Sequence, residues 1–388
     1  MIKNTQMNKT NLDRIIEQSK EALSQVKSGD FTIYFYLYNT GGVPKGGEGY
    51  IYDMALTLKE DGYNVKLLYF DDKNEFIHGS EWLGDKYKSL EALNSYEKIT
   101  MKPTDFVVIP ELYSNVMNAT TPNINEQGKF TGISSQRVVL AQNVGYITDI
   151  IPMGRQWGDY KIRNVITNSN MISNKVKDFF PYVNIKTIYP GVSDIFEKPL
   201  KPKDLTITIV ADEDSKISRV VKQFMWKNPL FKWFTFKNIR NLSREEFADE
   251  VKKSAILVWE DVDTNFGYVA LEAMKAGTVV VGRVPDNLPD WMSEDDNLSN
   301  CGVWVQNTDE IADALSGVVT AIISDKMPED YIKSMKEVSD KYSMSNFKKN
   351  TIDTWKELIG EYEAELEGLI AETEKKKADV EKIKNQKQ

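Results

Sequence analysis

The chain has 388 residues, of which 41% are hydrophobic, and a formal net charge of -9. This length and apolar content predict two domains with cores of their own, and the negative charge excludes a chain-wide basic surface for nucleic acid or anionic membranes. With only one cysteine, Cys301, and one histidine, His78, a disulfide-built fold is excluded, and neither a zinc site nor a histidine-dependent triad is expected.

The N-terminal part is typical of the first βαβ unit of a Rossmann-like domain. An amphipathic helix ends before Gly29, and a strand follows at 31–38. The loop 39–49 holds five glycines and leads into a helix, which is followed by a strand at 65–70. Glycines let a backbone approach a ligand closely, but this loop matches neither the dinucleotide fingerprint nor a P-loop.

Further short strands complete a predicted parallel sheet in the first half of the chain. They lie at 106–110, 138–142, 165–167 and 185–189. A basic, proline-punctuated segment at 198–203 is predicted to be the linker to a second domain.

The second domain begins with a strand at 205–210 and an acidic loop, after which Lys216 and Arg219 are the nearest cations. The segment 226–244 then carries five basic residues, no acidic residue and several aromatic ones. We interpret 233–236 as the second strand of this sheet. Contact with nucleic acid through the same side chains is the alternative.

The segment 264–282 is the most informative one in the chain. Gly267 opens a short helix, Gly277 ends it at a left-handed C-cap position, and a buried strand follows at 278–281. Backbone N–H groups near Gly267 would bind an anion, and Glu272 follows about one and a half helical turns later. This pattern suits a nucleotide diphosphate, with the phosphates on the amides and the ribose hydroxyls on the carboxylate.

Three acidic residues precede this segment, directly after a strand predicted at 255–259. Glu260, Asp261 and Asp263 should lie at the carboxyl edge of the sheet, where such folds bind ligands. They could contact a bound sugar, or they could be solvated loop acids.

Asn265-Phe266-Gly267 and Glu272-Ala273-Met274-Lys275-Ala276-Gly277 resemble, in register, the donor-binding signature of retaining glycosyltransferases of family 4. In that family a first Glu, eight positions before the second, contacts the transferred sugar, and the second contacts the ribose. Here Thr264 occupies the first position, so the resemblance supports nucleotide binding better than the identity of the sugar. The loop 39–49 also resembles the family's N-terminal glycine-rich loop.

The resemblance implies an α/β protein with the GT-B fold, in which two Rossmann-like domains with parallel sheets face a central cleft and a C-terminal helix crosses back. It implies an acceptor-side domain at 1–196, a donor domain at 204–340 and a helical crossover with a charged tail at 341–388. The expected activity is transfer of a sugar from a nucleotide-diphosphate sugar with retention of the configuration at the anomeric carbon. No metal or other cofactor is expected, and no residue is assigned as a catalytic base.

The resemblance also assigns site residues. The donor-binding residues would be Glu272, Gly267, Phe266, Asn265, Thr264, Asp263, Lys216 and Arg219. The phosphate and acceptor loop would comprise Gly41, Gly42, Lys45, Gly46 and Gly47.

The acceptor stays open at this point: a glycan, a lipid-linked sugar, a protein, or hydroxymethylated cytosine in DNA, as for phage GT-B enzymes. An inactive GT-B-like scaffold is the alternative, favoured by Thr264 and by the acidic residues at 212–214. Apolar residues at helical spacing in the tail, such as Leu358 and Leu366, predict a surface or self-associating helix and a homodimer. No apolar run approaches the ~20 residues of a membrane span, and the polar start lacks a signal-peptide core, which predicts a cytoplasmic protein.

Overall fold

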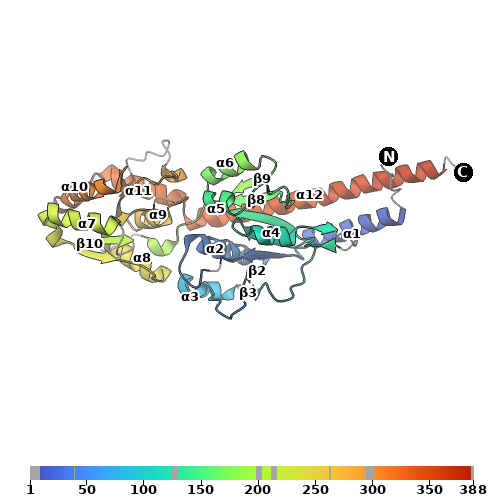
Figure 1. The fold of residues 1–388 in the computed structure, drawn as a ribbon, viewed down its shortest axis with the longest axis horizontal. Helices are drawn as coiled ribbons and strands as arrows, with labels where there is room; N and C mark the ends of the chain where they lie inside the picture. Colours follow the sequence, from blue (N-terminus) through green and yellow to red (C-terminus); the bar gives the residue numbers. More distant parts are fainter. Residues whose placement is uncertain are drawn as a thin grey trace.

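The computed structural model describes residues 9–38, 40–124, 130–197, 203–210, 216–261, 264–292 and 301–385. Figure 1 shows two α/β lobes next to each other and one long helix that passes along the N-terminal lobe and protrudes beyond it. Each lobe contains a parallel sheet with helices packed on it, as the alternation of strands and helices predicts. No helix within these ranges is both long and apolar enough to cross a membrane.

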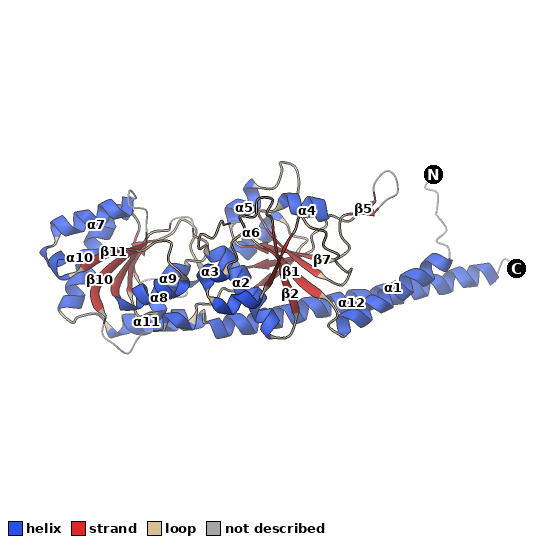
Figure 2. Cartoon of the chain, turned by 90° about the horizontal axis from the view of Figure 1, so that it is seen from below, coloured by secondary structure: helices blue, strands red, loops and turns tan. Residues whose placement is uncertain are grey.

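The N-terminal lobe is built on a seven-stranded parallel sheet in the order β3-β2-β1-β4-β7-β8-β9. Every residue of the central strands β1 and β4 is buried, because helices cover both faces of the sheet (Figure 2). The strands are β1 Thr32–Tyr36, β2 Asn64–Tyr69, β3 Glu91–Asn94, β4 Phe106–Pro110, β7 Gln136–Ala141, β8 Asn164–Thr167 and β9 Asn184–Thr187.

Helices lie between most of these strands along the chain, as parallel crossovers favour, whereas β3 leads into β4 through the loop 95–105. The α-helices of the lobe are α1 Lys9–Lys27, α2 Gly46–Glu60, α3 Ser80–Leu83, α4 Ser114–Thr120, α5 Val144–Asp149 and α6 Asn170–Phe179. A small antiparallel pair, β5 Asn123–Ile124 and β6 Phe130–Thr131, and the 3-10 helix η1 Asp85–Ser89 complete it. A further 3-10 helix, η2 Asp194–Phe196, follows β9 and packs Phe196 into the core of the C-terminal lobe.

The C-terminal lobe repeats the architecture with a five-stranded parallel sheet in the order β11-β10-β12-β13-β14. Its strands are β10 Asp204–Val210, β11 Thr235–Asn238, β12 Ser254–Trp259, β13 Val279–Arg283 and β14 Val303–Val305. Its helices are α7 Lys216–Lys227, α8 Arg244–Lys253, α9 Tyr268–Lys275, α10 Ile311–Ile323 and α11 Glu329–Lys341, with 3-10 turns η3 Pro229–Trp233, η4 Asp290–Met292 and η7 Thr308–Glu310.

The last helix, α12 Met344–Asn385, returns to the N-terminal lobe, so the expected C-terminal crossover is confirmed. Trp355 and Leu358 belong to the same buried cluster as Phe35 and Phe106 of the N-terminal sheet. The rings of Trp355 and Phe106 meet edge to face with 5.7 Å between their centroids. The first and the last described helices, α1 and α12, therefore belong to the same lobe.

Beyond the sheet, α12 runs antiparallel to α1, as Figures 1 and 2 both show. Leu12 and Leu366 are buried in this contact region. Exposed ion pairs connect the two helices, namely Asp13–Lys377, Lys20–Glu374 and Lys27–Glu367. The apolar stripe that suggested self-association thus packs against its own chain, and it does not require a second copy.

The strand prediction differs from the structure at several places, and the short strands β5, β6 and β14 were not predicted. The predicted strand at 233–236 begins at Thr235, because Trp233 lies in η3 with its side chain 69% exposed. The edge strand β3 was not predicted, since its sequence Glu-Ala-Leu-Asn lacks the β-branched residues that mark a strand. Of the predicted linker at 198–203, residues 198–202 lie outside the described residues.

Candidate functional site

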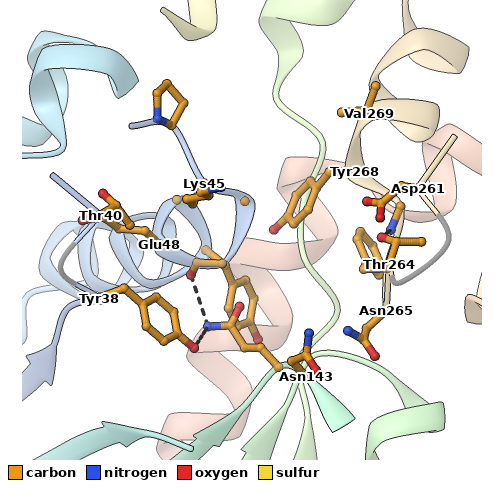
Figure 3. A pocket seen from close by; sticks show the side chains of 18 of the residues that line it. Tyr38, Thr40, Lys45, Glu48, Asn143, Asp261, Thr264, Asn265, Tyr268 and Val269 are labelled. Carbon is orange, nitrogen blue, oxygen red and sulfur yellow. Dashed lines mark hydrogen bonds between the residues drawn. The ribbon is translucent and has the colours of Figure 1, made fainter. Parts of the chain in front are cut away.

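A cavity of about 980 Å³ lies between the two lobes. It is lined by residues that follow the carboxyl ends of strands in both sheets, such as Tyr38, Glu111 and Gln142 on one side and Ile239 and Asp261 on the other. Figure 3 shows side chains from the two lobes facing each other across this space. The carboxyl edges of parallel sheets are where α/β folds bind ligands, so this cavity is the candidate site.

The segment 264–267, which we call the donor loop, is held by hydrogen bonds that involve the side chains of Thr264 and Trp291. Thr264 Oγ1 accepts a hydrogen bond from the N–H of Gly267 at 2.9 Å, and the indole N–H of Trp291 donates to the Phe266 carbonyl at 2.6 Å. Gly267 has a φ of +75°, and a Cβ there would lie 3.0 Å from the Trp291 ring. Glycine is therefore required at this position, and the start of α9 is fixed in the wall of the cavity.

Glu272 lies on α9 and lines the cavity with only 8% of its surface exposed. Burial raises the pKa of this carboxyl to about 7, while the charge of Arg244 lowers it and that of Asp53 raises it further. Asn265 and Phe266 also line the cavity, although Phe266 packs its ring against Tyr268 in the core. The donor-loop residues Thr264 to Gly267 and Glu272 are thus brought together as the motif predicts.

Arg244, at the start of α8, connects the two lobes across the cavity. Its guanidinium lies 3.3 Å from the Asp53 carboxylate of α2 and donates to the Tyr87 hydroxyl at 3.2 Å. The side chains of Arg244 and Asp53 are 11% and 6% exposed, so this ion pair is largely removed from water. Burial lowers the pKa of Arg244, but Asp53 and Tyr87 outweigh that effect and raise it.

Sequence reasoning missed this pair. The capping box of Ser243 and Glu246 locates Arg244 at the first turn of a helix, but nothing in the sequence connects it with a residue 191 positions earlier. A second contact between lobes is made by Asp290, whose carboxylate accepts from the backbone N–H groups of Asn170 and Met171 at 2.6 and 3.1 Å. Within the described residues, both contacts are polar and both join the two lobes.

The glycine-rich loop divides into two parts. Gly46 and Gly47 line the cavity: a Cβ on Gly46 would lie 3.2 Å from the Tyr268 ring, and one on Gly47 would lie 3.4 Å from Gln142. Gly41 and Gly42 have φ values of +60° and +80° and do not line it. These two glycines shape the turn that leads to the cavity, and their predicted role in the phosphate and acceptor loop stays a prediction.

Lys45 stands at the N-cap of α2 and lines the cavity. Figure 3 shows it on the same side as Thr40 and Glu48 and across from Tyr268. Its ammonium group is thus available to a ligand that binds between α2 and the donor loop, which agrees with its predicted place in the phosphate loop.

The N-terminal side of the cavity contains a buried carboxyl that the sequence did not reveal. Glu111 accepts hydrogen bonds from the N–H groups of Gln142 and Asn143 at 2.9 and 2.8 Å, and from the Tyr38 hydroxyl at 3.2 Å. Burial raises its pKa to about 7, although these donors lower it. Glu111 therefore holds the ends of β1, β4 and β7 together.

One of the two cations expected after β10 does not lie at the cavity. Arg219 is exposed on α7 and does not line the cavity. The side chain of Lys216 and the whole of Asp263 lie outside the described residues. In the part of the chain that the structure describes, the basic residues that line the cavity are Lys45, Arg240 and Arg244.

The chain matches no protein-family model. It is 22% identical over 282 residues to an alpha-1,6-glucosyltransferase of Actinobacillus pleuropneumoniae, covering 68% of this chain and 79% of that protein. It is also 36% identical to an uncharacterized glycosyltransferase of Methanocaldococcus jannaschii over 109 residues. This match covers 27% of this chain and 26% of that protein.

Solved structures share the fold at low sequence identity. The Anabaena protein HepE, in complex with UDP-glucose, matches with a TM-score of 0.55 at 12% identity and covers 84% of this chain and 99% of its own. An alpha-glucosyltransferase in complex with UDP-glucose and DNA containing an abasic site matches with a TM-score of 0.51 at 11% identity, over 85% of this chain and 99% of its own. Together with the two Rossmann-like lobes, these likenesses identify the fold as GT-B.

Proposed function

We propose that this chain, a glycosyltransferase with the GT-B fold, transfers glucose from UDP-glucose to a hydroxyl group of a carbohydrate acceptor. The observation that carries the proposal is the buried Glu272 on α9, in the wall of the cavity and one helical turn beyond the N–H groups of the helix start. Glucose is proposed because the relative that matches most of the chain is named a glucosyltransferase, and UDP-glucose because a structure with the same fold holds it.

In this proposal the nucleotide lies along the C-terminal lobe. Glu272 accepts hydrogen bonds from the ribose hydroxyls, and the base lies by the loop 239–242 that follows β11. The diphosphate binds at the positive end of α9, where Tyr268 and Val269 present backbone N–H groups. Lys45 supplies positive charge from the opposite lobe, in place of the cations that the acidic loop after β10 lacks.

The chemistry that suits this arrangement is positioning and stabilisation of the leaving group. We propose that the transfer retains the configuration at the anomeric carbon, that the departing phosphate takes the acceptor proton, and that no metal ion is required. The anomeric configuration of the product can be read from its NMR coupling constant. Activity that is unchanged by EDTA and by added Mg²⁺ would agree with the absence of a metal requirement.

The charge of the cavity favours an uncharged acceptor. Its described lining contains five acidic side chains, Glu48, Asp53, Glu111, Asp261 and Glu272, against the three basic ones. A DNA acceptor would add its own negative charge to this site, and the exposed, partly basic region around Trp226 and Trp233 precedes β11, at the sheet edge away from the cavity. We therefore rank DNA as the second candidate acceptor, after carbohydrate. It is a candidate because a structure with the same fold was solved in complex with DNA.

The test is direct. Isothermal calorimetry should detect UDP binding, and Glu272→Gln should weaken it by about 1 to 3 kcal/mol, the cost of losing a charged hydrogen-bond pair. Release of UDP from UDP-glucose should rise when oligosaccharides are added, and hydroxymethylcytosine-containing DNA should have no effect. A protein that binds UDP but never releases it from any sugar nucleotide would be the inactive scaffold, and equal UDP affinity in Glu272→Gln would refute the site.

A further inference from the structure

Glu48 is a buried carboxyl in the wall of the cavity. Its contacts within the described residues do not account for the burial of this group. It is the third residue of α2, it is 2% exposed, and it lines the cavity. Within the described residues its hydrogen-bond donor is the hydroxyl of Thr40, and no lysine or arginine pairs with it. Figure 3 shows Thr40 and Glu48 together, on the side of the cavity that faces Tyr268.

The other buried carboxyls of this lobe differ from Glu48. Asp53 has the guanidinium of Arg244, and Glu111 accepts three hydrogen bonds that hold strand ends together. Asp105 accepts hydrogen bonds from the backbone N–H groups of Thr32 and Lys102 at 2.8 and 2.6 Å. Glu48 has neither a cation nor such a set of donors, and burial raises its pKa to about 7 although the Thr40 hydroxyl lowers it. A carboxyl kept in such surroundings is costly to the fold, which is typical of a residue that serves a ligand.

A second unsatisfied acceptor lies in the same wall. Asn168 is 5% exposed and lines the cavity, and its side-chain oxygen is buried without a hydrogen-bond partner within the described residues. Its amide group donates to the carbonyl of Gln142 at 3.3 Å, and the Gln142 amide donates to the carbonyl of Gly47 at 3.1 Å. The wall thus contains two acceptors in need of donors, connected through Gln142 to the first turn of α2.

The position of the first turn of α2 indicates which ligand group supplies hydrogen-bond donors to Glu48 and Asn168. Gly46 is close enough to Tyr268 that a Cβ would lie 3.2 Å from its ring, and Tyr268 is the first residue of α9. The first turn of α2 therefore lies next to the start of α9, where the diphosphate is proposed to bind. A group attached to that diphosphate falls next to Glu48.

We infer that Glu48, with Asn168 behind it, binds hydroxyl groups of the sugar carried by the donor nucleotide. The inference rests on the proposed function, since it takes the nucleotide to lie on the C-terminal lobe. Sugar hydroxyls are hydrogen-bond donors, which is what both side chains lack, and a carboxylate is the stronger acceptor of the two. The sugar is then recognised by the lobe opposite the one that binds the nucleotide.

The test compares UDP with UDP-glucose in the full chain by calorimetry at pH 8. Glu48→Gln keeps the size of the side chain and an oxygen for Thr40, so its melting temperature should stay at or above that of the parent. Its affinity for UDP should stay within about twofold, while its affinity for UDP-glucose falls about tenfold or more, the effect of a lost hydrogen bond to a charged group. Glu60→Gln, an exposed position on the same helix, should change neither affinity.

Other results would overturn the inference. Equal UDP-glucose affinity in Glu48→Gln and in the parent would mean that the carboxyl does not contact the donor sugar. An equal loss for UDP and UDP-glucose would mean that Glu48 supports the nucleotide or the fold. Asn168→Leu provides a second variant. Its affinity for UDP should again stay unchanged while its affinity for UDP-glucose falls. A parent protein that binds neither ligand would instead refute the proposed function itself.

Discussion

The two walls of the cavity are built in different ways. The donor loop and α9 form one wall from a single stretch of chain, 264–272, which is held by backbone conformation and by hydrogen bonds from Thr264 and Trp291. The opposite wall brings together the first turn of α2 and the ends of β1, β4, β7 and β8, and it is held by side chains.

This difference assigns different roles to the two walls. A wall fixed by its backbone offers N–H groups and one carboxylate in constant positions, which suits the nucleotide that every donor shares. A wall of buried acidic and amide side chains can vary by substitution without moving the chain, which suits the sugar and the acceptor. If the walls divide the work in this way, substitutions in each wall should have separable effects on binding, turnover and stability.

The largest effect is expected where the walls meet. Gly46→Val would direct two methyl groups at the Tyr268 ring, which lies only 3.2 Å from the position of a Cβ on residue 46, and would push α2 away from α9. Displacing a binding element by about 1 Å can reduce turnover on the order of 100-fold, and we expect that loss with little change in melting temperature. Gly317→Val, on α10 with open space around its Cβ position, is the control, and equal activity of both variants would show that the walls need not touch.

The next effect concerns the ion pair between the lobes. Arg244→Ala leaves Asp53 buried without its cation, which should lower the free energy of unfolding by about 3 kcal/mol. Adding Asp53→Asn to that variant should recover part of the loss, because no charge is then left buried. A double-mutant cycle by urea denaturation measures the coupling. Additive effects of the two substitutions would show that the pair does not connect the lobes energetically.

A smaller effect is expected in the pH dependence of stability. The pKa of Glu272 is about 7 in the folded protein against 4.5 for a free carboxyl, so the folded state binds more protons between these values. Its contribution to the free energy of unfolding is therefore complete below pH 4.5 and is lost as the pH rises through 7, by about 1 to 3 kcal/mol. Glu272→Gln cannot titrate and should lose less stability than the parent between pH 5 and pH 8. Parallel stability curves for the two proteins would contradict the burial of this charge.

The smallest effect is expected at Thr264. Its hydroxyl oxygen accepts from the Gly267 N–H, so Thr264→Val should loosen the donor loop and weaken UDP binding by about 1 kcal/mol. Thr264→Ser keeps the oxygen and should bind UDP as the parent does. If both variants bind equally, the loop is held by Trp291 and the backbone of Gly267 without help from this side chain.

The wall formed by the donor loop and α9 could be predicted from the sequence because its geometry is local. Gly267, Glu272 and Gly277 lie within eleven residues, and each has a backbone or charge requirement that its residue type reveals. The wall opposite could not be predicted, since Glu48, Glu111 and Asn168 meet only through the order of strands in the sheet. The pairing of Arg244 with Asp53 depends further on how the two lobes face each other, and no spacing in the chain encodes it.

The most direct test of the account is a crystal structure of the protein with UDP-glucose. We predict the ribose hydroxyls within hydrogen-bonding distance of Glu272, the diphosphate at the backbone N–H groups of Tyr268 and Val269, and the glucose between α9 and the first turn of α2. A nucleotide bound elsewhere in the cavity, or one whose ribose makes no contact with Glu272, would contradict the central claim that the donor loop and α9 form the nucleotide site.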